Sequence, residues 1–342
     1  MGDGTSIGWT DATWNPIRGC RRTAPEGSKQ SGCGDTTGGG CYAERQAARF
    51  CGPGQAYEGL VKITASGPRW TGKVKFVNDH LMDPFRWTRP RRIFTDSMSD
   101  MFYEGVTDPM RDRIVAVMMI CAHHETRGGH IFQTLTKRPK NMRRYFEDPA
   151  TRERVARQAG TMMEDGDAFF DVIMEQGLVH SSMWWGTSIE NQWAIDERLI
   201  DLLATPAACR FLSIEPMLGP VAIGTLGTLP GDEFPGYELV ANRLHWVIVG
   251  CESGPGARPC DVQWIRDVRD ECATGDVAFF LKQATPLKGV VEDREGSWTK
   301  GTNAHPLIEL PYLDGIQHVA FPDVHGLQFS GSRTKPTEDG AA

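Results

Sequence analysis

Short apolar segments alternate along the chain with longer amphipathic segments. The apolar segments are rich in β-branched and aromatic residues and lie at 91–100, 130–139, 183–190, 209–216, 245–254 and 277–283. Helical patterns fill the intervals. Residues 108–124 begin with Asp108 and Pro109, a favourable helix start, and place Ile114 and Cys121 on one stripe. Strands that alternate with helices are typical of a parallel sheet buried on both faces.

A seventh strand is predicted at the N-terminal stretch IGWTDATWN, and the length of 342 residues fits a barrel better than a doubly wound sheet. The six apolar segments end in the polar clusters TDSMSD, TLTKRP, TSIE, LSIEP, GCESG and LKQ. In a (β/α) barrel these strand ends meet at one face, and that face holds the active site. We therefore predict an α/β protein with a (β/α) barrel or partial barrel of parallel strands.

The predicted organisation is a barrel over 1–283, a small C-terminal β extension over 284–329 and a disordered tail over 330–342. Within the barrel we expect a cysteine loop at 19–51, an irregular helical insertion at 151–180 and a loop containing Gly and Pro at 219–243. Either insertion is a candidate for a lid over the site.

The composition is globular, with 40% hydrophobic and 24% charged residues, which excludes disorder of the whole chain. A formal net charge of −7 argues against a protein that coats nucleic acid non-specifically, because that mode of binding needs a basic surface. No run of eighteen apolar residues occurs, and the N-terminus does not resemble a signal peptide. We expect a cytoplasmic protein that does not contact a membrane.

Four of the nine cysteines fall in one glycine-rich stretch: Cys20, Cys33, Cys41 and Cys51. In a reducing compartment such a cluster indicates metal binding or redox chemistry rather than disulfides. The stretch follows the first predicted strand and therefore lies over the face where the polar strand ends meet. Three thiolates there would hold an iron–sulfur cluster, and four would close a structural zinc site.

Several segments, taken together and in this order, resemble a known family. They are GWTDATWNPIRGC, CYAER, RRIFTDSMSDMF, FQTLTKRP, WWGTSIEN, RFLSIEPMLGP, WVIVGCESGPGARP and FFLKQ, and they run from about Trp9 to Gln283. The chain resembles the phage-encoded three-cysteine-motif family, which is similar to radical S-adenosylmethionine enzymes of the spore photoproduct lyase type. The resemblance implies a barrel of that enzyme class, located in the cytoplasm of a bacterial host if the protein is phage-encoded.

The resemblance also implies a 4Fe–4S cluster held by Cys20, Cys33 and Cys41, with S-adenosylmethionine bound to the fourth iron. An electron donor would reduce the cluster, and the resulting 5′-deoxyadenosyl radical would abstract hydrogen from the substrate. A small anionic or nucleotide substrate, or a base within a nucleic acid, is expected.

Further site residues follow from the same interpretation. Ser97, Ser99 and Asp100 end a strand where such enzymes hold the methionyl amino group, and Tyr42 is the aromatic residue beside the third cysteine. The residues expected to bind ribose hydroxyls are Ser188, Glu190 and Glu215, although Ser188 alternatively caps a helix. The residues expected to orient an anionic substrate or the cofactor carboxylate at strand ends are Lys137, Arg138 and Lys282.

The cysteine spacing leaves a second hypothesis open. Twelve residues separate Cys20 from Cys33 and seven separate Cys33 from Cys41, which is wider than the usual C-x3-C-x2-C arrangement. The alternative is a zinc-stabilised barrel, with Cys51 as a fourth ligand, that binds or hydrolyses a nucleic-acid ligand.

Overall fold

The computed structural model describes residues 5, 7–23, 41–124, 129–224, 243–254, 257–294, 299–302 and 305–323. Its centre is a nine-stranded sheet in the order β1-β6-β7-β8-β9-β10-β11-β14-β13. The first seven strands of that order are parallel: β1 (Ala12–Trp14), β6 (Arg92–Thr95), β7 (Ile131–Thr136), β8 (Met183–Ile189), β9 (Cys209–Ile214), β10 (Trp246–Gly250) and β11 (Ala278–Ala284).

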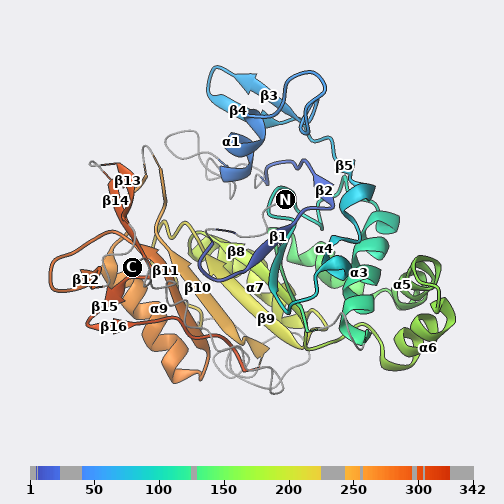
Figure 1. Cartoon of the computed structure of the whole chain (residues 1–342). Coiled ribbons are helices and arrows are strands. Elements are labelled where there is room, and N and C mark those ends of the chain that lie inside the picture. Colours follow the sequence, from blue (N-terminus) through green and yellow to red (C-terminus); the bar gives the residue numbers. More distant parts are fainter. Residues whose placement is uncertain are drawn as a thin grey trace, which may run out of the picture.

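The strand order distinguishes the two parallel architectures. A doubly wound sheet reverses its strand order at a switch point. Here the seven parallel strands lie side by side in the order in which they occur along the chain. The sheet is strongly curled and has β1 and β13 as its edges (Figure 1). The prediction of an α/β partial barrel is confirmed.

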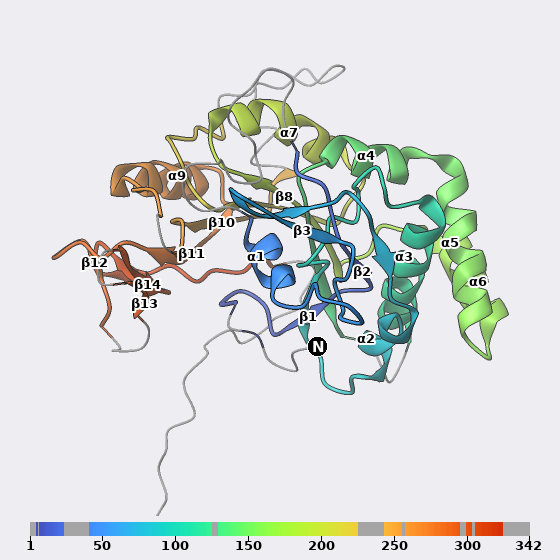
Figure 2. The same ribbon diagram turned by 90° about the horizontal axis from the view of Figure 1, so that it is seen from above.

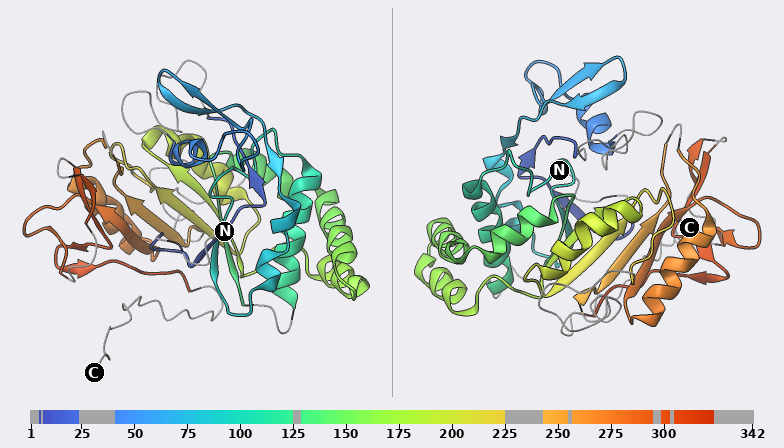
Figure 3. Two further views of the ribbon diagram at one scale, coloured as in Figure 1. Left: turned by 45° about the horizontal axis from the view of Figure 1, so that its top comes forward. Right: turned by 180° about the vertical axis from the view of Figure 1, so that it is seen from behind.

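Helices cover the outer face of the sheet: α3 (Asp108–His123), α4 (Pro139–Glu147), α7 (Gln192–Ala204) and α9 (Val262–Thr274). Viewed from above, they lie around the outside of the curled sheet (Figure 2). The range expected as a helical insertion contains two regular helices, α5 (Pro149–Met162) and α6 (Gly166–Gln176), which stand beside α3 (Figure 3). The short helices η1 (Asn78–His80) and α2 (Asp83–Arg86) precede β6.

Side chains at the helix starts accept hydrogen bonds from otherwise unpaired backbone amides. Asn191 Oδ1 accepts from Ala194 N at 3.1 Å before α7, and Asp261 Oδ1 accepts from Gln263 N at 2.8 Å before α9. Ser188 lies within β8. The alternative interpretation of Ser188 as a helix cap is therefore wrong, because Asn191 caps this helix.

The two faces of the sheet are packed by different side chains. Aliphatic residues such as Val247 and Val249 pack with the helices on the outer face. A second buried cluster is largely aromatic and comprises Trp9, Ile131, Trp184, Cys209, Phe211, Trp246, Ile248 and Phe280. Along β9 the positions on this side change from Phe211 to Ser213 and then Glu215. The concave side thus has an aromatic floor and a polar rim at the carboxyl ends of the strands.

A small unit, which we call the roof, comprises residues 17–23 and 41–77. It contains α1 (Tyr42–Ala48) and two antiparallel ladders, β2 (Ile17–Arg18) with β5 (Lys75–Phe76) and β3 (Val61–Thr64) with β4 (Gly67–Trp70). Its own buried cluster consists of Ala47, Leu60, Val61 and Trp70. Figure 2 shows α1 and β3 over the middle of the sheet.

The C-terminal strands extend the sheet beyond β11. β14 (His305–Glu309) is antiparallel to β11 and to β13 (Thr299–Thr302), and a separate three-stranded sheet contains β12 (Val291–Glu292), β15 (Tyr312–Leu313) and β16 (Ile316–Gln317). The expected tail at 330–342 and most of the expected loop at 219–243 lie outside the described residues. Among the helices described, none is long and apolar enough to cross a membrane.

Candidate functional site

A cavity of about 760 Å³ lies between the roof and the carboxyl ends of the parallel strands. Every predicted site residue that the structure describes lines it: Cys20, Cys41, Tyr42, Ser97, Ser99, Asp100, Lys137, Arg138, Ser188, Glu190, Glu215 and Lys282. The charged groups expected at the strand ends therefore share one cavity with two of the three cysteines. Cys33 lies outside the described residues.

Cys20 follows a turn whose backbone is fixed. Gly19 has φ of +93°, and a Cβ atom there would lie 2.3 Å from Lys73 O, so this turn requires glycine. Gly19 N donates to Met98 O at 3.4 Å, and Gly19 forms a parallel bridge with Ser99. The turn thereby presents Cys20 beside the polar segment that follows β6.

Cys41 immediately precedes α1, and an ion pair connects it to the segment of Cys20. Arg22 Nε lies 3.1 and 3.0 Å from the two carboxylate oxygens of Glu44, which is only 1% exposed. Glu44 Oε1 also accepts from Trp70 N at 2.8 Å. Arg22 comes two residues after Cys20 and Glu44 three residues after Cys41. The pair therefore sets the spacing between the two cysteine-bearing segments.

Glu190, just after β8, is a buried carboxylate that two cations share. Its Oε1 contacts Lys137 Nζ at the end of β7, and its Oε2 accepts from Arg198 Nη1 of α7 at 3.0 Å. Arg198 Nη1 also donates to Ser188 O at 2.7 Å. Buried charges remain stable when they are paired and hydrogen-bonded in this way. The network fixes the ends of β7 and β8 relative to each other.

The carboxylate of Asp100 is hydrogen-bonded to neighbouring segments of the chain. Its Oδ1 accepts from Thr136 Oγ1 at 2.7 Å and from Phe102 N at 3.0 Å, and its Oδ2 accepts from Lys137 N at 3.1 Å and from Arg138 Nη1 at 2.9 Å. Both oxygens are thus engaged by the protein. These contacts differ from the expectation that Asp100 holds the amino group of a cofactor.

Arg138 is similarly engaged. It pairs with Asp100 and with Glu104, and its Nη2 donates to Arg21 O at 2.8 Å. Burial disfavours the charged guanidinium, but Asp100, Cys20 and Glu104 outweigh burial and raise the pKa of Arg138. These contacts favour a role in holding the segment of Cys20 over the expected contact with an anionic substrate.

Glu215 receives a second pair of donors on the opposite side of the rim. Lys282 Nζ and Gln283 Nε2 both donate to Glu215 Oε1, the latter at 3.2 Å. Gln283 Nε2 also donates to Cys251 O at 2.6 Å. The ends of β9, β10 and β11 are therefore joined by side chains that line the cavity.

Three acidic residues of this cavity, Asp96, Glu252 and Glu309, were missed by the sequence analysis. Asp96 follows β6, is 2% exposed, and has φ of +59°. Burial raises the pKa of its carboxyl group to about 7, although Ser99 and the amide of Ile17 oppose the rise. Glu252 follows β10 and accepts from Arg258 Nε and Nη2, both at 2.8 Å. Only the tolerance of aspartate for left-handed backbone offered a signal for Asp96.

The charges of the cavity wall nearly balance. The described lining residues include five basic side chains, Arg45, Lys137, Arg138, Arg258 and Lys282. They include six acidic side chains, Asp96, Asp100, Glu190, Glu215, Glu252 and Glu309. A wall of this kind suits a zwitterion or a nucleoside with many hydrogen-bonding groups better than a polyanion.

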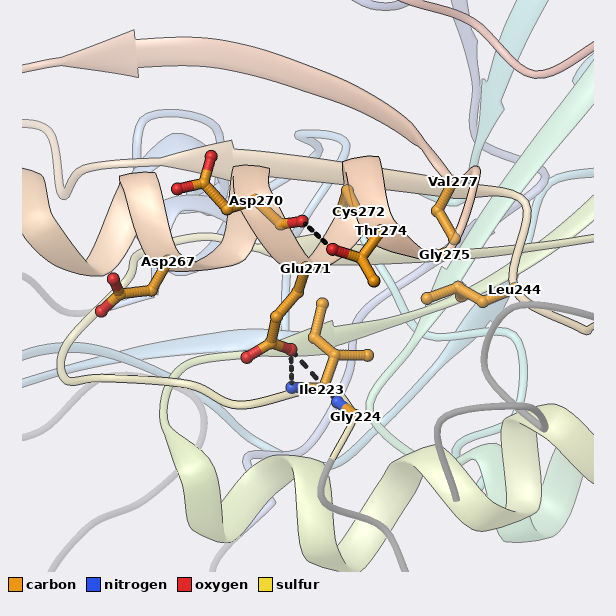
Figure 4. A pocket seen from close by; sticks show the side chains of 10 residues that line it. All are labelled: Ile223, Gly224, Leu244, Asp267, Asp270, Glu271, Cys272, Thr274, Gly275 and Val277. Carbon is orange, nitrogen blue, oxygen red and sulfur yellow. Dashed lines mark hydrogen bonds between the residues drawn. The ribbon is translucent and has the colours of Figure 1, made fainter. Parts of the chain in front are cut away.

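A second cavity, of about 500 Å³, lies at the opposite ends of the strands. It is lined by residues near the start of β10 and β11, including Leu244 and Val277, and by the end of α9 (Figure 4). Glu271 Oε2 crosses it and accepts from Ile223 N at 2.6 Å and from Gly224 N at 3.1 Å. Residues at the amino ends of barrel strands usually serve stability, and Glu271 ties the chain after β9 to α9.

The donors at the cavity mouth fit a thiolate-bound group. Cys20 and Cys41 are partly exposed thiols on the same wall and form no disulfide, and Cys33 lies between them in the sequence. Cys51 packs with the roof core, and its thiol donates to Ala48 O at 3.2 Å. Within the described ranges, no three His, Cys, Asp or Glu side chains are grouped as a metal site, so a complete donor set needs Cys33.

Cys121 and Cys209 are buried in the protein and do not line the main cavity. Cys121 and Cys209 are 1% and 0% exposed, as predicted from their apolar surroundings, and burial raises the pKa of the Cys121 thiol to about 12.

A family model described as a protein of unknown function (DUF5131) matches residues 4–306. The chain belongs to the DUF5131 family. The matched range contains the seven parallel strands, the roof and every predicted site residue, and it supplies all the described lining residues of the cavity except Glu309. No curated protein and no solved structure matches the chain.

Proposed function

We propose that this DUF5131 protein is a radical S-adenosylmethionine enzyme that abstracts hydrogen from a nucleotide or a nucleic-acid base. The observation that carries the proposal is the position of Cys20 and Cys41 on one cavity with the polar carboxyl ends of a partial parallel barrel. With Cys33 they would hold a 4Fe–4S cluster. When bound, such a cluster supplies one electron to S-adenosylmethionine and so releases a 5′-deoxyadenosyl radical.

The residues of the chain have distinct tasks in this proposal. Gly19 and Arg138 position the segment of Cys20, and the pair of Arg22 with Glu44 positions Cys41. These supporting contacts affect metal affinity, because residues that hold the ligands in place determine how tightly a metal group is bound.

Other residues bind and enclose the organic ligands. Ser188 and Glu215 offer oxygen atoms to the ribose hydroxyls of the cofactor, whereas both carboxylate oxygens of Glu190 are already bound by Lys137 and Arg198. The aromatic floor below and the roof above limit the access of water, which protects a reactive species from side reactions.

The test is the metal content of single cysteine variants. Wild-type protein, purified and reconstituted without oxygen, is expected to hold about four iron and four sulfide per chain. Cys20→Ala, Cys33→Ala and Cys41→Ala should each lose most of this iron. After chemical reduction, only the wild type should convert S-adenosylmethionine to 5′-deoxyadenosine.

Cys51→Ala is the matched control, because Cys51 lies in the same segment but packs with the roof core. It should retain its iron and its cofactor cleavage. Equal loss of zinc from all four variants, with no iron in the wild type, would establish the four-thiolate zinc alternative and overturn the proposal.

A further inference from the structure

The roof has a charge opposite to that of the rest of the molecule. It contains nine basic and two acidic residues, a formal charge of +7 in a chain whose total is −7. The remainder of the chain therefore carries −14. A polyanion would be repelled by the net charge of the rest of this protein and attracted to the net charge of the roof.

The positive residues of the roof are also placed where they repel one another. Lys62 lies directly opposite Arg69 in the ladder of β3 and β4, and Lys75 lies directly opposite Arg18 in the ladder of β2 and β5. Like charges at directly opposed positions destabilise a ladder. Both two-stranded ladders of the roof thus carry a cationic pair that a bound anion would stabilise.

The roof also carries exposed aromatic rings, and these lie at the cavity mouth. Tyr42 and Phe50, at the two ends of the segment around α1, are 57% and 53% exposed, and both line the cavity. Arg45, between them, lines it as well. Aromatic rings beside a basic surface are the means by which proteins stack the bases of single strands.

We infer that the roof binds a single-stranded segment of nucleic acid and directs one nucleotide into the cavity beneath it. The phosphates contact Lys62, Lys73 and Lys75, which are exposed. One base stacks on Phe50, and the next nucleotide enters the space of about 760 Å³, where the balanced wall suits a nucleoside rather than further phosphates. That this nucleotide is the substrate rests on the proposed function, whereas binding of the strand by the roof does not.

The experiment measures binding of a fluorescein-labelled single-stranded oligonucleotide by anisotropy at several salt concentrations. The full-length chain carries Lys62→Glu with Lys75→Glu, or Phe50→Ala. The lysine variant should weaken binding at least tenfold and lower the slope of log K against log salt by one to two, since about one phosphate contact is lost per lysine. Phe50→Ala should weaken binding about tenfold with little change in that slope.

The matched control is Arg152→Glu with Lys288→Glu, which changes the charge equally at two exposed positions outside the roof. It should bind within about twofold of the wild type. Equal loss in both double variants, or tighter binding of the corresponding duplex, would overturn the inference. So would binding to vesicles of acidic phospholipid that exceeds binding to the oligonucleotide.

Circular dichroism of each variant establishes that it is folded, and iron content separates the two proposals. Binding that depends on the roof in a protein without iron would support the inference and remove the radical chemistry. Cleavage of S-adenosylmethionine without oligonucleotide binding by the roof would support the radical chemistry and overturn the inference about the roof.

Discussion

Asp96 carries a buried carboxyl group at the end of β6, on the wall of the main cavity. The sequence places Asp96 and Asp100 in the same polar cluster and gives no reason to distinguish them. Their surroundings do so: Asp100 pairs with Arg138, whereas Asp96 is buried and accepts from the backbone amide of Ile17 at 3.3 Å. Both partners lie far away in the sequence, and a pattern of polar positions does not contain that information.

Asp96→Asn should make the protein more stable at pH 8 and leave its stability nearly unchanged at pH 4. Burial raises the pKa of Asp96 from 3.8 to about 7, so between these values the folded state keeps a proton that the unfolded state has released. The free energy of unfolding of the wild type therefore falls as pH rises from about 4 to about 7. Asparagine does not titrate, and the gain at pH 8 should be on the order of 3 kcal/mol.

Urea unfolding across this pH range measures the gain, and Asp276→Asn is the control. Asp276 also has a left-handed backbone, with φ of +53°, but it is exposed. Its replacement should have no effect that grows with pH. A difference between Asp96→Asn and the wild type that is the same at both pH values would contradict the assignment of a raised pKa.

At the scale of elements, the barrel strands could be predicted and the roof could not. Each parallel strand is buried on both faces, so its sequence is a continuous apolar segment bounded by polar residues. The ladders of the roof have two to four residues per strand and are half exposed, and within Val61–Thr64 only Val61 is buried. Their pairing depends on the small core around Trp70, which only the folded chain assembles.

Under the proposed function, Glu44→Gln should loosen the proposed 4Fe–4S cluster without removing a thiol. The carboxylate of Glu44 joins α1 to Arg22 and thus holds the segment of Cys41 against that of Cys20. Loss of a supporting contact of this kind typically weakens metal binding by about 10–100-fold. Reconstituted Glu44→Gln protein should therefore release iron to a chelator faster than the wild type, as followed by absorbance.

Glu58→Gln serves as the control for this prediction. Glu58 is an exposed acid of the same roof, and its Oε2 accepts from Gly54 N at 2.8 Å. This variant should release iron at the wild-type rate. Equal rates for Glu44→Gln and the wild type would mean that the ion pair does not control the spacing of the cysteines.

At the scale of the whole molecule, the shared cavity of the strand-end residues could be predicted because parallel strands impose it. The carboxyl ends of the strands meet at one edge, so Lys137, Glu190, Glu215 and Lys282 had to come together once the strands were found. The pairing within this group was not predictable, because Arg198 pairs with Glu190 from α7, in a direction that a strand pattern leaves open. The packing at the amino ends of the strands was not predictable either, because a segment from the distant C-terminal part of the chain packs there.

Phe321 is the residue through which that C-terminal segment joins the barrel. Its ring lies 5.1 Å from that of Trp246 and 5.4 Å from that of Phe280, and the guanidinium of Arg92 lies 4.4 Å from its centre. The adjacent Ala320 O accepts from Trp246 Nε1 at 2.9 Å. The segment therefore contacts β6, β10 and β11 towards their amino ends, away from the cavity.

Phe321→Ala should lower the free energy of unfolding by about 2 kcal/mol, because it removes a half-buried ring from the aromatic floor. Oligonucleotide binding by the folded variant should match the wild type, since the roof lies at the other ends of the strands. Phe50→Ala should do the opposite, weakening binding while leaving urea unfolding within about 0.5 kcal/mol of the wild type, because its ring is exposed. If Phe321→Ala weakened oligonucleotide binding as much as Phe50→Ala does, the separation of a stabilising end and a binding end of this barrel would be wrong.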